Sequence, residues 1–563
     1  MTATVILNNF KAPQMWRNKY RRSTYEIWDA NLHHGDVRPF ACPEFVCGNT
    51  YEQIFVDRSC ECGGFDIRLP LVNGFSPGSY YVVSSGTLKH GTSNELCSDE
   101  SLDWAGAPVP DVIVSPTPNC NGCDIIGVSY VITYVVSHNG VRIESSPSEP
   151  TEIVSGNGSV PFVNLVWVSA SGAMSNYNIV ATRLYRTEST FEDGEDSIPS
   201  DGSEYVFVKE FSGGAGQTFF DDVHTNNTGG PLLTYDPMSF PAPYGDIVDV
   251  TRTQDGIVVA EQNRLFISEP GKPQFSYDGI VQIEDTIIAI EAIGNTIFVL
   301  TDNKPVKIAY RHTDGIISID RQVVERRLPL TSRESVSVYG GRVYFASTHS
   351  LYLWDTGGYG ADISSALTTL ITPEQWRNIG PTSVVGVAHE FGYIMSSDNL
   401  DYSLMIELAG DGADTINATS MVPISYINPI SFGLDYDGHI MFSDLTGTYR
   451  WDYRRLVDTL LFNIQDNTRP RLQDQCDCCP WKLTMYFDNE GKNRFSKMRV
   501  EWDERSATHL NGRFYLKAFG NEEELTDGLE IISSRGFSIP KYQSSQTFCV
   551  EVSGCGIMQE IRL

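Results

Sequence analysis

The stretch of sequence that decides the fold runs from Ile126 to Pro273. It contains, in order, Tyr130-Val131-Ile132-Thr133-Tyr134-Val135-Val136, the turn His138-Asn139-Gly140, Glu144-Ser145-Ser146-Pro147-Ser148-Glu149-Pro150, Thr182 to Glu188, Tyr205 to Lys209, Phe219 to Asp222, and Val258 to Pro270. Most of these pieces are short runs rich in β-branched and aromatic residues that end at turn-forming residues. The stretch therefore predicts a succession of short β-strands.

Length and composition extend this prediction to the whole chain. At 563 residues the chain is too long for one domain. Its 48 glycines, 28 prolines and 11% aromatic residues favour many short strands joined by turns. We predict an all-β, multidomain protein with four parts: an irregular N-terminal platform or docking region (1–125), a fibronectin-like β-sandwich module (126–235), an irregular five- or six-bladed β-propeller (236–460), and a C-terminal β-domain (461–563).

The propeller prediction rests on a repeat. A glycine precedes an apolar strand at five places, namely Gly256, Gly294, Gly341, Gly392 and Gly438. Their spacing of about 38 to 51 residues is the length of a four-stranded blade. An array of sandwiches is the competing fold. One short helix is expected as an insertion between blades, capped by Thr372 with Pro373 at its first position.

Charge limits the partners. The chain has 41 basic and 71 acidic side chains, so its formal net charge is −30. Such a chain is not expected to bind nucleic acid by neutralising phosphates, although an acidic wall could surround DNA without holding it. The simpler interpretation is an acidic surface that keeps the protein soluble. One basic run near the N-terminus is a candidate docking arm for an acidic partner, with an exposed first helix as the plainer alternative: Lys11, Arg17, Lys19, Arg21 and Arg22.

The twelve cysteines carry the sharpest chemical signal. Seven precede residue 124 and five follow residue 475. Weak candidates for a metal site are the clustered ones: Cys60, Cys62, Cys120, Cys123, Cys476, Cys478 and Cys479. Structural zinc needs four soft ligands, and only one Cys-x-x-Cys knuckle is present. Free thiols and disulfides within the clusters stay open as alternatives, but disulfides are not the first expectation because the sequence has no secretion signal.

Motifs for catalysis are missing from the sequence. It contains no nucleophile elbow, Walker loop, Rossmann fingerprint or His-Glu-x-x-His. It also lacks the Ser-x-Asp-x-Gly-x-Thr-Trp boxes of sialidase-type propellers. We therefore expect no enzyme, no catalytic residues and no cofactor. Without a long apolar segment or a signal peptide, synthesis and assembly in a cytoplasm are expected.

The order of phrases in the opening stretch resembles the tail nozzle proteins of short-tailed bacteriophages, the tail tubular protein B or tail hub family. The phrases are the strand Tyr130 to Val136, Glu144-Ser145-Ser146-Pro147-Ser148, Leu184-Tyr185-Arg186, Tyr205 to Val208, Phe220-Asp221-Asp222, Phe240-Pro241-Ala242-Pro243, and Arg264 to Pro273. The match covers residues 100–275. The propeller matches only by pattern, and the cysteine clusters are not a feature that the family explains.

This resemblance implies a structural virion protein that forms a ring, typically a homohexamer, at the end of the tail. The ring would close the DNA channel and pass the genome during ejection. Implied partners are other copies of the chain, the portal adaptor (head-to-tail connector), tail fibres or spikes, and double-stranded DNA that passes without specific binding. We hypothesise a mainly acidic lumen, since basic contacts would hold the phosphates. The alternatives are a receptor- or glycan-binding propeller of a tail fibre or surface adhesin, and a glycan-cleaving propeller.

Overall fold

A computed structural model describes most of residues 43–451, with gaps that include 188–203, 223–229, 232–245, 356–362 and 410–416, together with short strands before and after this range. The chain forms two compact units. One unit comprises Leu69–Arg327, and the other combines Met1–Arg68 with Leu328–Leu563. No helix of the described residues is long and apolar enough to cross a membrane.

Besides the sheets of a sandwich, the described residues of Leu69–Arg327 form three four-stranded antiparallel meanders of the kind that makes a propeller blade. Their strands are β8 (Leu71–Asn73), β9 (Ser79–Ser84), β10 (Thr87–Thr92) and β11 (Asp103–Trp104); β21 (Ile247–Arg252), β22 (Ile257–Glu261), β23 (Arg264–Ser268) and β24 (Phe275–Gln282); and β25 (Ile287–Ile293), β26 (Thr296–Thr301), β27 (Val306–Thr313) and β28 (Ile316–Val323). A short helix, α1 (Ser93–Cys97), follows β10.

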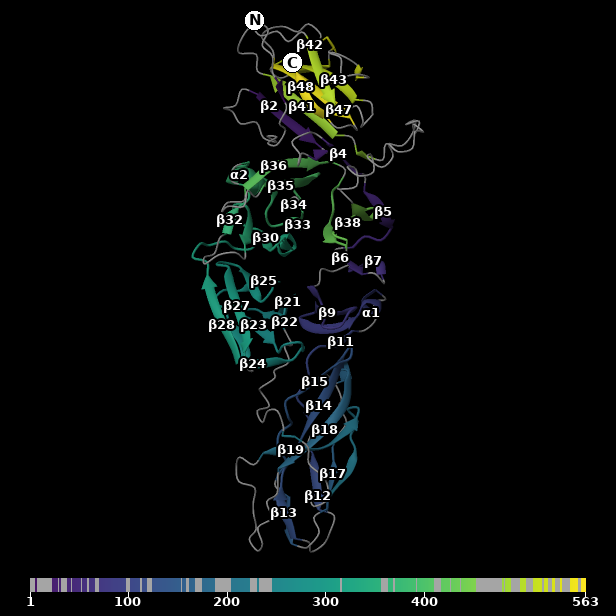
Figure 1. The fold of residues 1–563 in the computed structure, drawn as a ribbon, viewed down its shortest axis with the longest axis vertical. Helices are drawn as coiled ribbons and strands as arrows, with labels where there is room; N and C mark the ends of the chain where they lie inside the picture. Colours follow the sequence, from purple (N-terminus) through teal and green to yellow (C-terminus); the bar gives the residue numbers. More distant parts are fainter. Residues whose placement is uncertain are drawn as a thin grey trace. The chain divides into compact units, whose positions relative to one another are not determined.

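A β-sandwich separates the first of these blades from the second. Its larger sheet has the order β15-β14-β18-β19 and its smaller sheet the order β12-β17-β20, while β13 and β16 form a separate pair. The bounds are β12 (Ser115–Pro118), β13 (Asp124–Val128), β14 (Tyr130–His138), β15 (Val141–Glu144), β16 (Val154–Asn157), β17 (Phe162–Val166), β18 (Ile179–Thr187), β19 (Tyr205–Ser212) and β20 (Thr218–Asp222). In Figure 1 the strands β14 and β15 follow directly on the sheet that contains β9 and β11.

The other unit contains three more blades. They are formed by β29 (Ser337–Tyr339), β30 (Arg342–Ala346), β31 (Leu351–Asp355) and β32 (Ile363–Ser365); by β33 (Val385–His389), β34 (Gly392–Ser396), β35 (Ser403–Ala409) and β36 (Asn417–Ile424); and by β37 (Ser431–Leu434), β38 (Ile440–Asp444), β39 (Gly447–Trp451) and β5 (Glu44–Cys47). The helix α2 (Pro373–Ile379) and the 3-10 turn Arg333–Ser335 lie in the connections. The outer strand β5 comes from about 400 residues earlier in the chain than its neighbour β39.

The same unit contains strands from both ends of the chain. A six-stranded sheet is formed by β2 (Ser23–Trp28), β41 (Trp481–Phe487), β47 (Thr547–Gly554), β43 (Leu510–Ala518), β44 (Asn521–Glu524) and β45 (Leu529–Ile531). A four-stranded sheet is formed by β1 (Ile6–Leu7), β48 (Met558–Arg562), β42 (Lys497–Trp502) and β46 (Phe537–Ser538). The remaining strands are β3 (Ala30–Asn31), β4 (Arg38–Ala41) and β40 (Cys478–Cys479), and the hairpin β6 (Gln53–Asp57) and β7 (Cys60–Phe65).

Apolar side chains on consecutive blades pack against one another inside each unit. Leu88 of β10 joins Val250 and Phe266 of the next blade in one buried cluster. In the other unit, Trp376 of α2 is fully buried in a cluster shared by the blades β29–β32 and β33–β36. Full burial of a large apolar side chain stabilises the fold by about 1.5–3 kcal/mol, so these clusters hold neighbouring blades together.

The structure confirms the predicted fold class, an all-β multidomain chain with propeller blades. Four of the five repeated glycines lie in the turn between the first and second strands of a blade, and Gly392 is the first residue of the second strand, β34. The predicted helix is also present, because Thr372 accepts a hydrogen bond from the Gln375 backbone in a capping box and Pro373 opens α2.

The expectation for the N-terminal region is wrong over part of its length. The sequence predicts an irregular region over residues 1–125, but residues 71–104 form the regular blade β8–β11. Gly78, with a φ of 72°, occupies its first turn as four of the repeated glycines do elsewhere. The inserted sandwich separates Gly78 from Gly256, which hides the blade from a search for a regular spacing.

Candidate functional site

The sandwich contains a buried ion pair that joins its two sheets. The guanidinium of Arg186 on β18 donates to both carboxylate oxygens of Asp221 on β20, at 2.7 Å each. The hydroxyl of Tyr130 on β14 donates to the same carboxylate at 2.8 Å. Asp221 is fully buried and Arg186 is 3% exposed. Burial, followed by the negative charge of Asp221, raises the pKa of Tyr130, so this hydroxyl stays a donor.

A second set of contacts explains the Glu-Ser-Ser-Pro-Ser phrase. After β15 the chain runs alongside β14. Three residues of this segment, spaced three apart, bond to three residues of β14, spaced two apart. The backbone N–H groups of Ser145, Ser148 and Thr151 donate to the carbonyls of Tyr134, Ile132 and Tyr130, at 2.8 to 2.9 Å. Their hydroxyl oxygens accept the N–H groups of the same three residues, at 2.9 to 3.1 Å. Hydroxyl side chains thus complete a ladder that a regular strand would make with its backbone alone.

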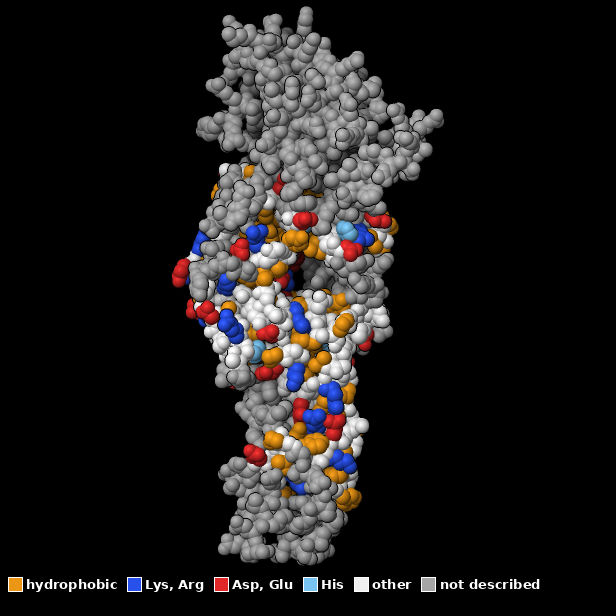
Figure 2. Space-filling view, viewed as in Figure 1, with side chains coloured by type: hydrophobic (Ala, Val, Ile, Leu, Met, Phe, Trp, Pro, Cys, Tyr) orange, Lys and Arg blue, Asp and Glu red, His pale blue; other side chains and the backbone are white. Residues whose placement is uncertain are grey.

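A charged network covers the outer face of the larger sandwich sheet. Arg183 donates to Glu144 at 2.5 Å and to Glu210 at 2.9 Å, and Arg142 donates to Glu210 at 2.8 Å. Figure 2 shows acidic and basic side chains gathered on the sandwich. Burial works to lower the pKa of Arg183, but the hydrogen bonds that Arg183 donates to Glu210 and Glu144 raise it. The hydrogen bond from Arg142 lowers the pKa of Glu210. The network is internally compensated, so it organises the sheet surface and leaves little unpaired charge.

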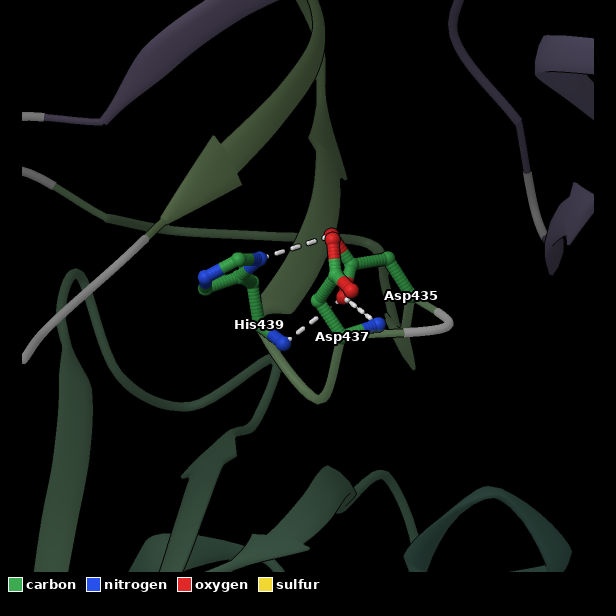
Figure 3. A group of neighbouring side chains, drawn as sticks. All are labelled: Asp435, Asp437 and His439. Carbon is green, nitrogen blue, oxygen red and sulfur yellow. Dashed lines mark hydrogen bonds and ion pairs between the residues drawn. The ribbon is translucent and has the colours of Figure 1, made fainter. Parts of the chain in front are cut away.

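The turn between β37 and β38 carries a candidate cation site, Asp435, Asp437 and His439, shown in Figure 3. Oδ1 of Asp435 accepts the N–H groups of Asp437 and His439 at 2.9 and 2.8 Å, so this carboxylate holds the turn closed. Burial works to raise the pKa of Asp435, but hydrogen bonds from His439 and the charge of Arg450 hold it below its ordinary value. This group was not predicted from the sequence, although the pattern Asp-x-Asp-Gly-His, which could have indicated it, surrounds the repeated Gly438.

Arg450 of β39 already supplies a cation to this turn. Its Nε lies 2.8 Å from Oδ2 of Asp435, and its Nη2 lies 3.3 Å from Oδ2 of Asp437. Nδ1 of His439 lies 2.9 Å from Asp435 Oδ2 and 2.6 Å from Arg450 Nη2. The guanidinium thus already contacts the carboxylate oxygens and the imidazole nitrogen that would have to bind a metal ion. The arrangement acts as an ion-paired clasp that fixes the hairpin.

The residues proposed from sequence as ligands or docking groups fall largely outside the described side chains. Cys60 and Cys62 lie on β7, and Cys478 and Cys479 lie on β40, but the structure does not describe their side chains. Cys120, Cys123 and Cys476 lie outside the described residues. So do all five docking candidates: Lys11, Arg17, Lys19, Arg21 and Arg22. Both proposals remain predictions.

Cys47 is disulfide-bonded. The low expectation for disulfides is therefore wrong at this position, which lies outside the predicted cysteine clusters. Cys47 is the last residue of β5, the outer strand of the blade β37–β39. One cysteine of this disulfide thus lies on the strand that completes the blade.

Comparison with known proteins gives only distant structural likeness. No family profile and no curated protein matches the sequence. The WD40 β-propeller domain of Doa1 is 8% identical, with 73% of this chain and 97% of that chain covered and a TM-score of 0.26. The Pan2 WD40 domain of Neurospora crassa is 7% identical, covering 52% and 86%, with a TM-score of 0.23. The extracellular domain of BT4673, a putative one-component system of B. thetaiotaomicron, is 12% identical, covering 72% and 46%, with a TM-score of 0.24.

The class that the chain's own strand pairing defines is an all-β, multidomain protein with four-stranded propeller blades. A β-sandwich is inserted after the first blade, and the last blade is completed by the N-terminal strand β5.

Proposed function

We propose that this chain is a non-enzymatic structural protein of the tail nozzle type, which assembles into a ring around a DNA channel in the tail of a short-tailed bacteriophage. The observation that carries the proposal is the convergence of the diagnostic phrases in space. The phrases that contain Tyr130, Ser148, Arg186 and Asp221 are far apart in the sequence, yet each contributes a buried contact to one sandwich. The phrases therefore belong to one folded domain, the sandwich.

The charge of the chain supports the same proposal. A lumen that passes DNA must not hold the phosphates, because each basic contact adds affinity that delays the strand. The net charge of −30 suits a wall that repels the DNA backbone. We propose that the portal adaptor binds the ring through the basic run Lys11 to Arg22 and that tail fibres or spikes attach outside.

The decisive experiment is imaging of the purified full-length chain, alone and mixed with the portal adaptor. A closed ring with an axial channel, of sixfold symmetry, is the expected result. A chain that stays monomeric or trimeric under both conditions would overturn the proposal. The channel wall in such images also tests the acidic lumen, since a lining made mainly of Lys and Arg would contradict it.

A propeller that binds a receptor or glycan is the second candidate. One observation favours it: the blade β37–β39 with β5 exposes apolar side chains that are available to a ligand. Leu445 is 88% exposed and Phe45 is 57% exposed, and the ring of Phe45 packs edge-on against Tyr449 at 5.6 Å between centroids. Exposed aromatic rings are common in sugar-binding surfaces, because sugar C–H groups stack on them. Binding of the monomer to a glycan array, lost in Phe45→Ala, would favour this candidate.

A further inference from the structure

Two histidines lie buried side by side where the sandwich meets the first blade. His90 belongs to β10 of the blade, and His138 is the last residue of β14 in the sandwich. Their ring centroids are 4.0 Å apart with 31° between the planes. His90 is 3% exposed and His138 is 2% exposed. Two imidazoles in this position can both be neutral, but protons on both would place two positive charges in contact without water.

The hydrogen bonds at this joint suit neutral rings. The hydroxyl of Tyr81 lies 3.2 Å from Nδ1 of His138. Among the described residues, neither ring nitrogen of His90 has a hydrogen-bond partner. A protonated imidazole has two N–H donors that both need acceptors. Protonation of His90 would therefore bury a charge whose donors are unsatisfied.

Other contacts also cross the joint: Ala107 lies in one buried cluster with Val136 and Tyr177 of the sandwich. The side-chain amide of Asn139 donates to the Gly91 carbonyl at 3.2 Å, and the hydroxyl of Ser76 donates to the Asn139 carbonyl at 3.2 Å. Trp104 packs edge-on against Tyr177 at 5.5 Å between ring centroids. The contacts other than the histidine pair are thus apolar or neutral hydrogen bonds, so the two imidazoles are the groups of this contact that gain charge on mild acidification.

The charged and titratable groups around the two histidines do not neutralise the positive charge that a proton on either imidazole would add. The negative charge of Glu95 on α1 acts on His90 and favours its protonated form. However, Oε2 of Glu95 already accepts hydrogen bonds from the N–H and the hydroxyl of Thr92, at 2.6 and 2.9 Å. Asp103 of β11 pairs with His90 through the backbone, and burial, then Glu95, raises its pKa. Tyr81 of β9 contacts His138, and the positive charge of Arg252 on β21 acts on Tyr81.

The balance of these effects favours neutral histidines. Burial lowers the pKa of His90 to about 4, against the opposing charge of Glu95. Burial also lowers the pKa of His138 well below its ordinary range; His90 lowers it further, and the Gly106 backbone opposes the change. The folded joint therefore binds protons more weakly than the opened joint does, and acid favours opening.

We propose that His90 and His138 make the joint between the sandwich and the first blade an acid-sensitive hinge. On acidification the hairpin β14–β15 separates from β10, while the blades β21–β24 and β25–β28 keep their structure. The inference is independent of the tail nozzle proposal, since it depends only on this joint.

Hydrogen–deuterium exchange of the full-length chain tests the hinge. With a pKa of about 4 in the closed joint and 6.5 in the open one, His90 alone makes opening about 30-fold more favourable at about pH 5 than at about pH 7.5. After correction for the pH dependence of intrinsic exchange, we expect a loss of protection of that size in β10 and β14. Protection of β22 and β23 should not change.

Variants separate the hinge from general acid unfolding. His90→Phe keeps a stacked ring without a titrating group, and it should reduce the loss of protection at about pH 5 by about 30-fold. His90→Gln serves the same purpose if the Phe variant does not fold. His349→Asn, at an exposed site in the other unit, is the matched control and should behave as the wild type. Equal loss of protection in His90→Phe and wild type, or simultaneous loss in β22 and β23, would overturn the proposal.

Discussion

Ser148 and Ile132 exchange two hydrogen bonds. The N–H of Ser148 donates to the Ile132 carbonyl at 2.8 Å, and the N–H of Ile132 donates to the Ser148 hydroxyl oxygen at 3.1 Å. Both residues are buried. A side chain therefore supplies a contact that the backbone usually makes in a sheet.

Ser148→Ala should lower the free energy of unfolding of the sandwich by about 1–3 kcal/mol, because the buried N–H of Ile132 loses its acceptor. Chemical denaturation followed by tryptophan fluorescence measures the change, since Trp167 lies in the sandwich core. Ser212→Ala, at an exposed position of β19, is the control and should have little effect. A loss of the same size in both variants would contradict the assigned role.

Arg186→Met should destabilise the sandwich by about 3–5 kcal/mol, because it leaves the buried carboxylate of Asp221 without its counter-charge. The double variant Arg186→Met/Asp221→Asn removes both charges and should recover part of this loss. The free energy of unfolding of the two variants measures the difference. Arg142→Ala, in an exposed ion pair, is the control and should cost at most about 1 kcal/mol.

Asp249→Ala should loosen two neighbouring blades. One carboxylate oxygen of this fully buried residue accepts the N–H of Ile290 on the next blade at 2.8 Å, and the other accepts the N–H of Val250 at 2.9 Å. We expect a loss of about 1–3 kcal/mol for each N–H left unpaired, and a smaller loss for Asp249→Asn, which keeps one acceptor. Asp302→Ala, which removes an exposed acceptor for Thr286, is the control in the same thermal unfolding assay.

Gly447→Val should detach β5 from its blade. A Cβ atom at this position would lie 2.5 Å from the Cys47 carbonyl oxygen and 2.9 Å from the Phe45 ring. Limited proteolysis under reducing conditions should then release the N-terminal segment faster than in the wild type; reduction removes any covalent constraint from the disulfide at Cys47. Gly48→Ala is the matched control, since a Cβ there meets no atom within 4 Å.

Asp435 should make the free energy of unfolding depend on pH in the acidic range. Its pKa is lower in the folded chain than the ordinary value of 3.8, so its contribution is present above that value and is lost as the pH falls through the folded pKa. Asp435→Asn should therefore lower stability at neutral pH and flatten the decline below about pH 4. Thermal unfolding across pH measures both effects, and an unchanged slope would contradict the clasp.

The elements that the sequence predicts well are those set by local chemistry. The capped helix α2 is determined by Thr372, Pro373 and Gln375, three residues within one turn. The strands after the repeated glycines are determined by a turn followed by apolar residues. In both cases the deciding residues are neighbours in the sequence, so their pattern is visible without the fold.

Other elements depend on pairings between distant residues. The strand β5 becomes a blade strand only because β39 leaves a free edge for Phe45 and its neighbours. The ion pair of Arg186 with Asp221 and the stacking of His90 on His138 also arise from contacts between separate strands. No local spacing reports such contacts, which is why the sequence identified the phrases but not their chemistry.

The completion of the last blade by β5 also has a consequence for synthesis. The hydroxyl of Thr448 donates to the carbonyl of Asn49, which lies 399 residues earlier in the chain. A ribosome releases the N-terminal strand first and its partner strand near the end, at about 5–20 residues per second. The newborn strand therefore waits tens of seconds with an open edge, and a chaperone that shields such edges during translation would raise the yield of folded protein.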